Sequence, residues 1–280
     1  MLLEVSNLTI EYRPDDGPAV RAAEDVSFSL DRGRVLGIVG ESGSGKSTAA
    51  MAVARLLPSP PAHITSGKIL FDGIDILAQP VEKMRLLRGK RIGVVFQDPI
   101  GSLSPLHRIG DQLEETVLLH EDVSRKTART AALEWLGKVG IPEPARKMRA
   151  WPHELSGGQQ QRVMIAMALM LQPDLVIADE PTTALDVSIQ SQILKLLSDL
   201  TRGKSAVLLI THDLAVVSQM ADSIVVMKDG RIVEKNDSAA DFFRRPVHEY
   251  SRSLLAALPS LKTRGRQLKT TVTAKGLLAQ

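Results

Sequence analysis

The fold of this chain is decided by the stretch Gly40-Glu41-Ser42-Gly43-Ser44-Gly45-Lys46-Ser47, which fits the pattern G-x-x-x-x-G-K-[ST]. The apolar run at residues 34–39 is typical of a buried strand, and residues 47–57 are rich in helix formers and end before Pro58. A strand, a glycine-rich loop and a helix in this order predict a phosphate-binding loop. Its glycines let backbone N–H groups approach phosphate oxygens, and the helix N-terminus adds partial positive charge there.

Two side chains of this loop carry specific chemistry. Lys46 can reach the outer phosphates of a nucleotide, and the hydroxyl of Ser47 can hold Mg²⁺. The alternative is a Gly/Ser turn that ends in a solvated lysine, and the flanking strand and helix argue against it. The predicted nucleotide-binding set comprises Gly40, Glu41, Ser42, Gly43, Ser44, Gly45, Lys46, Ser47 and Thr48.

Length and composition indicate a globular protein with a sizeable core. The chain has 280 residues, of which 44% are hydrophobic and 24% are charged. Since it has no cysteine, disulfides, zinc–thiolate sites and iron–sulfur clusters are excluded, in keeping with a reducing cytoplasm. Its longest apolar run, residues 163–171, is about half of what a bilayer crossing needs, and no secretory signal is visible. We therefore expect no membrane span in this chain.

The positive charge is concentrated at one end. The formal net charge is +3, yet residues 261–280 hold five basic and no acidic side chains, so the rest of the chain is slightly acidic. This distribution argues against nucleic-acid binding by the body of the protein. We expect residues 261–280 to form a flexible basic tail, solvated rather than bound to anionic lipid headgroups.

Hydrophobic periodicity predicts an α/β fold with a helical insertion. Predicted strands cover residues 2–12, 24–30, 34–39, 68–73, 91–96, 175–180, 206–210, 223–228 and 231–235. Predicted helices cover residues 47–57, 81–87, 109–120, 124–139, 155–170, 187–200, 239–243 and 250–258. The block at about 98–165 has mostly helical periodicity, and Asp229-Gly230 is typical of a hairpin turn.

Polar side chains follow two of the apolar strands. Asp179 and Glu180 end one strand, and His212 follows another. Taken alone, the carboxylates could mark a strand that has reached solvent, and a lone histidine is most often structural. Beside a phosphate-binding loop, Asp179 is suited to Mg²⁺ and Glu180, pointing to the other side, to polarising the attacking water. We expect His212 to bond the γ-phosphate or that water.

A second glycine-led helix start occurs in Leu155-Ser156-Gly157-Gly158-Gln159-Gln160-Gln161-Arg162. Exposed backbone N–H groups and the Ser156 hydroxyl would suit a second anion-binding helix end. The same residues also form a good capping box, with Ser156 as N-cap and Gln159 three residues later. The two interpretations are compatible.

Together these motifs resemble the ATP-binding cassette of ABC transporters, in full order over residues 2–236. The resemblance implies an ABC-type P-loop NTPase fold with an antiparallel β subdomain and a helical subdomain at about 98–165. It implies an ATPase with ATP and Mg²⁺ as cofactors. Its motifs fall on Tyr12, residues 40–47, Gln97, residues 155–159, residues 175–180, Ala184-Leu185-Asp186 and His212.

The resemblance also implies a role for each site residue. Glu180, His212 and Gln97 would be catalytic, and Ser47, Gln97 and Asp179 would hold the metal. Tyr12 would stack on adenine, although packing at a strand edge explains it equally well. Asp186 would be the D-loop aspartate. Ser156, Gly157, Gly158 and Gln159 would close over ATP bound to a second cassette, so that two cassettes sandwich two ATP molecules.

Further segments resemble the dipeptide/oligopeptide/nickel importer ATPases. These are Phe96-Gln97-Asp98-Pro99 with residues 102–105, residues 151–156, and the closing segment at 248–259 within about 237–260. Ser104, Trp151 and Glu249 depart from that pattern, as does the lack of a C-terminal cysteine cluster. Residues 1–260 would then form one nucleotide-binding domain. It would power import of peptides, or alternatively of nickel or a metal chelate.

Such a subunit would work with a second ABC ATPase subunit, identical or related, and with two membrane permeases. A solute-binding protein would act indirectly, and the subunit would lie at the cytoplasmic face of the membrane. An exporter subunit is an alternative. So is a soluble ABC ATPase acting on nucleic acid or ribosomes, although this chain has one cassette and no zinc cysteines. A plain P-loop kinase or GTPase would leave residues 156–159 without a role.

Overall fold

The computed structural model describes residues 1–14, 17–182 and 186–257, apart from the side chains of residues 187 and 188. The expected tail at 261–280 and the motif residues Ala184 and Leu185 lie outside the described residues. The strands are β1 (Leu3–Tyr12), β2 (Val20–Leu30), β3 (Val35–Val39), β4 (Ala62–Phe71), β5 (Ile74–Asp75), β6 (Ile92–Val95), β7 (Leu175–Asp179), β8 (Ala206–Thr211), β9 (Ser223–Lys228) and β10 (Arg231–Asn236). The helices are α1 (Lys46–Val53), α2 (Val81–Leu87), α3 (Pro99–Ser102), α4 (Ile109–Leu118), α5 (Arg125–Lys138), α6 (Pro144–Lys147), α7 (Gly157–Leu169), α8 (Val187–Thr201), α9 (Leu214–Met220), α10 (Ala239–Arg244) and α11 (Glu249–Ala256), with a 3₁₀ turn at Pro152–Glu154.

The central sheet of the described chain has six strands in the order β10-β9-β3-β8-β7-β6. All neighbouring pairs are parallel except β9 and β10. The inner strands β7 and β8 are buried along their whole length, as their continuous apolar sequences predict. The predicted hairpin turn between β9 and β10 is confirmed, because Asp229 and Gly230 both have positive φ, at 49° and 77°.

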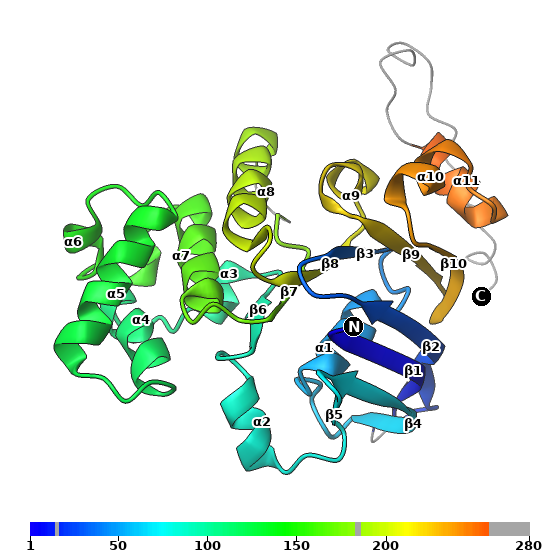
Figure 1. Ribbon diagram of the computed structural model, residues 1–280, viewed down its shortest axis with the longest axis horizontal. Coiled ribbons are helices and arrows are strands. Elements are labelled where there is room, and N and C mark those ends of the chain that lie inside the picture. Colours follow the sequence, from blue (N-terminus) through cyan, green and yellow to red (C-terminus); the bar gives the residue numbers. More distant parts are fainter. Residues whose placement is uncertain (15–16, 183–185, 258–280) are drawn as a thin grey trace, which may run out of the picture.

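A second, antiparallel sheet has the strand order β2-β1-β4-β5. Helix α1 lies between the two sheets, while α8 and α9 cover the other face of the central sheet (Figure 1). The core between the sheets joins alanines of α1 to large apolar side chains such as Phe71 and Ile38. This packing fixes the start of α1, and with it the loop at residues 40–47, against the end of β3.

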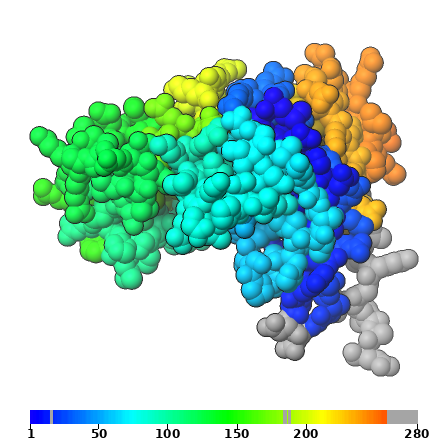
Figure 2. Space-filling view, turned by 60° about the horizontal axis from the view of Figure 1, so that its bottom comes forward, coloured from blue at the N-terminus to red at the C-terminus, as the bar shows by residue number. Residues whose placement is uncertain are grey.

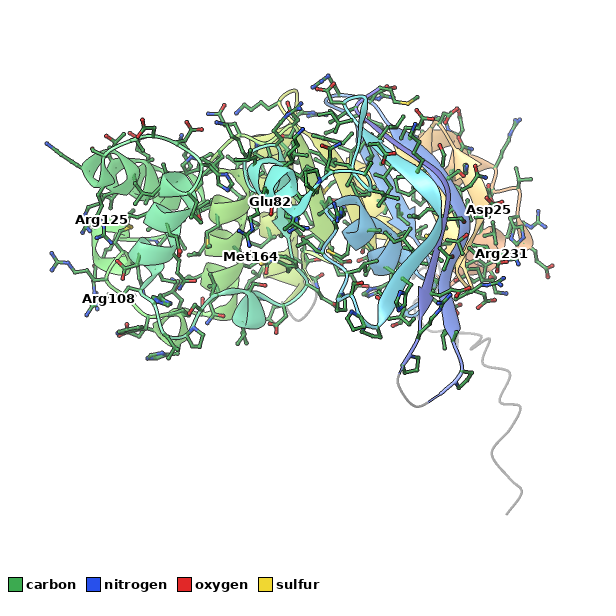
Figure 3. The ribbon with its side chains drawn as sticks, turned by 90° about the horizontal axis from the view of Figure 1, so that it is seen from below. Asp25, Glu82, Arg108, Arg125, Met164 and Arg231 are labelled. Carbon is green, nitrogen blue, oxygen red and sulfur yellow. The ribbon has the colours of Figure 1, made fainter. Side chains whose placement is uncertain are left out.

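The segment between β6 and β7 is helical throughout its described elements and contains α3 to α7. It forms a body of its own beside the sheets (Figures 1 and 2). Arg108 and Arg125 lie at its outer end, opposite Asp25 and Arg231 on the sheet side (Figure 3). The predicted α/β fold with an antiparallel sheet and a helical portion is thus confirmed. No helix in the described ranges is both long and apolar enough for a membrane crossing.

Several local elements differ from the sequence-based expectation. Strands β2 and β4 begin earlier than predicted, and the short elements β5, α3 and α6 were not predicted individually. Helix α1 ends at Val53 rather than near residue 57, because Arg55 turns into the left-handed region at φ 51°. Helix α9 was not expected, since its Val216-Val217 pair resembles a strand. Asp213 caps it by accepting the N–H of Ala215 at 2.8 Å.

Replacing Phe71 by alanine should lower the free energy of unfolding by about 3–5 kcal/mol, because the ring is fully buried between the two sheets. The matched control is Phe96→Ala, whose ring is 39% exposed and which should cost less than about 1 kcal/mol. Urea unfolding followed by circular dichroism measures both. Equal costs for the two variants would contradict the assigned core.

Candidate nucleotide site

The carboxyl ends of β3, β7 and β8 meet at a hollow of about 580 Å³. In open parallel sheets, ligands bind at this edge, where loops leave the strands. The residues lining the hollow are Ala22, Gly40, Glu41, Ser42, Gly43, Gly45, Lys46, Ser47, Thr48, Gln97, Glu180, His212 and Leu254. Most of the residues predicted from sequence are therefore brought together here.

The backbone of the loop is enclosed so closely that only glycine fits at its end. Gly45 has φ 94°, and a Cβ there would lie 2.1 Å from the carbonyl oxygen of Ala22. The hairpin tip between β9 and β10 supports the loop from the same side. The N–H of Gly230 donates to the carbonyl of Ser44 at 3.1 Å, and the carbonyl of Gly230 accepts from Glu24 at 2.8 Å. The loop thus has a fixed path before α1 begins.

Lys46 is buried and holds the first part of the loop. Its Nζ donates to the carbonyls of Gly40 at 2.9 Å and Glu41 at 2.7 Å. Burial lowers the pKa of Lys46, and the nearby carboxylates of Glu180 and Asp179 act in the opposite direction. A cation inside a ring of backbone groups at a helix start is suited to an anionic phosphate.

Ser47 lines the hollow, and Asp179 lies behind it as its hydrogen-bond partner. The Ser47 hydroxyl donates to Asp179 Oδ1 at 2.8 Å, and the carboxyl group is buried. Burial raises the pKa of Asp179, the charge of Glu180 raises it further, and the bond from Ser47 lowers it. Hydroxyl and carboxylate oxygens are ligands that Mg²⁺ accepts, so this pair fits the ion. No cluster of three or more acidic, histidine or cysteine side chains suited to a metal exists among the described residues.

Glu180 connects the ends of three strands. It leaves β7 with φ 45°, while its N–H donates to the carbonyl of Ile210 in β8 at 2.8 Å. Its carboxylate accepts from Gln97 Nε2 at 3.2 Å and lies 3.2 Å from His212 Nδ1. Asp179 therefore bonds to Ser47, whereas Glu180 contacts Gln97 and His212. The separation was predicted from the alternation of an extended chain, but Glu180 has a left-handed φ, so the turn of the backbone after β7 sets its direction.

Two predicted residues, Ser44 and Asp179, are buried behind the lining of the hollow. The other predicted residues that do not line the hollow, as the described residues define it, are Tyr12, Ser156–Gln159 and Asp186. Tyr12 ends β1 and is half-buried. Ser156 caps α7, accepting from the Gln159 N–H at 3.4 Å while Gln159 Oε1 accepts the Ser156 N–H at 3.3 Å. The predicted capping box is thus confirmed, and both Ser156 and Gly157 face solvent.

Two lining residues were missed by sequence reasoning. Ala22 in β2 meets the loop through its backbone, which leaves no pattern in the sequence. Leu254 in α11 reaches the hollow from the far end of the chain. The closing segment at 248–259 drew notice only as a family-like ending, and its apolar residues do not reveal what they contact.

Comparisons with known proteins agree with this geometry. A family model described as "ABC transporter" matches residues 23–183, more than half of the chain. A second model, described as "AAA domain, putative AbiEii toxin, Type IV TA system", matches the shorter stretch 151–218. The chain is 46% identical to the oligopeptide transport ATP-binding protein OppD of Bacillus subtilis (strain 168), over 97% of this chain and 75% of the relative.

Other relatives and solved structures give the same result. The dipeptide transport ATP-binding protein DppD of the same organism is 44% identical, over 95% of this chain and 79% of the relative. The structure titled as a dimeric post-hydrolysis state of the ATP-binding cassette MJ0796 bound to ADP and Pi aligns with a TM-score of 0.74 and 31% identity, over 84% of this chain and 98% of that one. The chain therefore belongs to the ABC transporter family, as one of its ATP-hydrolysing cassettes.

Proposed function

We propose that this cassette powers the uptake of di- or oligopeptides through separate membrane permeases. The observation that carries the proposal is its 44–46% identity, over nearly the whole chain, to proteins named for oligopeptide and dipeptide transport. Peptides are preferred over nickel or a metal chelate for the same reason. The chemistry in the cassette supplies free energy, and the choice of solute belongs to other subunits.

In the proposed reaction Glu180 orients the water that attacks the γ-phosphate. Its carboxylate is held between Gln97 and His212 by contacts of 3.2 Å each, so it has a defined direction within the hollow. Lys46 neutralises the outer phosphates from inside the loop, and the N-terminus of α1 adds to the positive potential. His212 contributes a hydrogen bond to the γ-phosphate or the water.

Residues Ser47, Gln97 and Asp179 are the proposed holders of Mg²⁺. When bound, Mg²⁺ would supply positive charge that stabilises the negative charge developing on the outer phosphates. Of these residues, Ser47 offers its hydroxyl directly, and Asp179 accepts from that hydroxyl at 2.8 Å. Asp179 would act mainly by orienting Ser47 and the ion's water molecules, in the way that outer carboxylates orient metal ligands.

A complete site is proposed to need two cassettes. The start of α7 is built to present N–H groups and the Ser156 hydroxyl, yet these residues lie outside the hollow of their own chain. They would close on the triphosphate held by the partner, with Asp186 at the same interface and Tyr12 against adenine. The dimeric cassettes of the related protein MJ0796 support this arrangement.

The permease contact is proposed for the surface beside Gln97. Phe96, Ile100 and Leu106 are large apolar side chains that are exposed in the isolated chain, with fractions of 39%, 70% and 78%. They lie at the junction of the central sheet and the helical part, so a bound membrane subunit would also contact a segment that touches the nucleotide hollow. This contact would make the chain a peripheral subunit at the cytoplasmic membrane face.

The variant Glu180→Gln should bind ATP with unchanged affinity and hydrolyse it at least about a hundredfold more slowly, because an amide is a poor base for the attacking water. Fluorescent-nucleotide binding and phosphate release measure the two quantities. The control Glu143→Gln removes an exposed carboxylate in the helical part and should behave as wild type. Hydrolysis at the wild-type rate in Glu180→Gln would remove this residue from its proposed role.

Mixing two inactive variants tests the shared site. The Ser156→Arg variant has an intact phosphate-binding loop, and the Lys46→Ala variant has an intact Ser156. A mixed pair of the two variants therefore contains one complete site, with the loop from the first variant and Ser156 from the second. Each variant alone should be inactive, and an equimolar mixture should recover about a quarter of wild-type ATPase activity if protomers pair at random. Full activity of Ser156→Arg as a monomer would contradict the two-cassette site.

Deleting the gene in its host should abolish growth when a required amino acid is supplied only as a di- or tripeptide. Growth on the free amino acid should persist, because the loss is one of uptake rather than metabolism. The wild-type gene should restore growth on peptide, and the Glu180→Gln gene should not. Unchanged peptide use with a loss of nickel-dependent growth would instead assign the chain to a metal importer.

A further inference from the structure

The C-terminal segment formed by α10 and α11 packs beside α9, on the face of the central sheet opposite α1 (Figure 1). Its approach is fixed by Glu234 in β10, whose carboxylate accepts the N–H groups of Val247 at 2.9 Å and His248 at 2.8 Å. His248 then caps α11 by accepting the N–H of Tyr250 at 3.1 Å. Helix α11 therefore starts at a defined point on the body of the protein.

Tyr250 is the residue of α11 that hydrogen-bonds to the backbone of the phosphate-binding loop, while Leu254 of the same helix lines the hollow. Its side chain is 8% exposed and belongs to an apolar cluster with Val39, the last residue of β3, and with Leu214 of α9. The ammonium of Lys228 lies 5.0 Å from the ring centroid, a further favourable contact. The hydroxyl oxygen accepts the backbone N–H of Glu41 at 3.1 Å.

Glu41 is thereby held on both sides of its α-carbon. Its N–H donates to Tyr250, and its carbonyl accepts from Lys46 Nζ at 2.7 Å. Two hydrogen bonds, one with the tyrosine hydroxyl and one with the lysine ammonium, therefore connect Tyr250 to Lys46 through the backbone of Glu41. Burial raises the pKa of Tyr250, and the nearby carboxylates of Glu41 and Asp229 raise it further, so the hydroxyl stays neutral at physiological pH.

We propose that Tyr250 is a positioning residue for the phosphate-binding loop, and that nucleotide binding and docking of the C-terminal segment stabilise each other through it. The inference rests on the proposed role of Lys46 and its loop in holding phosphate. Without the tyrosine hydroxyl, the peptide of Glu41 loses the partner that orients it, and the anchor of Lys46 becomes less defined. Because coupling is reciprocal, the free energy by which the docked segment favours nucleotide binding equals the free energy by which bound nucleotide favours docking of the segment.

A role in packing alone would make a different prediction, because Tyr250→Phe keeps the ring and removes only the hydroxyl. We expect this variant to weaken ADP binding and raise the KM for ATP by about 3- to 10-fold, the range for loss of one hydrogen bond. The value of kcat should stay within about twofold, since Glu180, Gln97 and His212 are untouched. Calorimetry with ADP and steady-state phosphate release measure these quantities.

Hydrogen exchange supplies the second readout. In the wild type, ADP should slow exchange of the backbone amides in Glu249–Ala256, because it stabilises the loop that Tyr250 contacts. In Tyr250→Phe this slowing should be reduced. The matched control is Ser253→Ala, which removes another hydroxyl from α11, one that donates to the carbonyl of Tyr250 at 2.7 Å within the helix. It should leave ADP affinity and the ADP-dependent slowing unchanged.

Three results would overturn the inference. These are unchanged ADP affinity in Tyr250→Phe, equal losses of affinity in Tyr250→Phe and Ser253→Ala, and an α11 whose exchange in the wild type ignores ADP. Any of them would leave the proposed ATPase roles intact, because those are tested separately by Glu180→Gln. Conversely, if Glu180→Gln kept its ATPase activity, the ADP-binding test of Tyr250 would still be valid, because that test does not depend on hydrolysis.

Discussion

The structure depends on one constraint: the backbone of residues 40–45 must turn from the end of β3 into the start of α1 while the surrounding main chain encloses it. Ala22, Met227 and Gly230 approach this stretch through their backbones, so side chains at Gly40 and Gly45 have no room. Parallel pairing then brings the ends of β7 and β8 beside the end of β3. Glu180 and His212, which follow β7 and β8, are thereby brought to the same hollow as the glycine-rich loop.

Most of the fold and much of the site could be predicted from sequence, because the informative patterns are local. A few consecutive residues are enough to indicate the conformation of the glycine loop, of the apolar strand that ends at Asp179 and of the capping box at Ser156. Helix α9 was missed because a seven-residue element with two valines lacks a readable period. The contacts of Ala22 and Tyr250 with the loop were missed because they join positions far apart in the chain. Ala22 uses its backbone carbonyl, which every residue has, and Tyr250 uses a hydroxyl, which every tyrosine has, so neither leaves a distinctive pattern in the sequence.

The two helix starts that are suited to anions lie in different surroundings. The N-terminus of α1 lies in the hollow, whereas that of α7 faces solvent on the helical part. The start of α7 therefore contributes nothing to the hollow of its own chain, as the described residues define it. In the proposed head-to-tail pair of cassettes, each helix start would contact a nucleotide, one in its own chain and one in the partner.

The hairpin tip at Asp229-Gly230 has a consequence for how this protein tolerates change. Tips of edge hairpins usually accept insertions, since they face solvent and contact little. Here the N–H of Gly230 donates to Ser44, and its carbonyl accepts from Glu24. The tip therefore supports the phosphate-binding loop and connects it to β2. We therefore expect this turn to tolerate insertions poorly, both in natural variants and as engineered tags, although it is a short turn at the edge of the sheet.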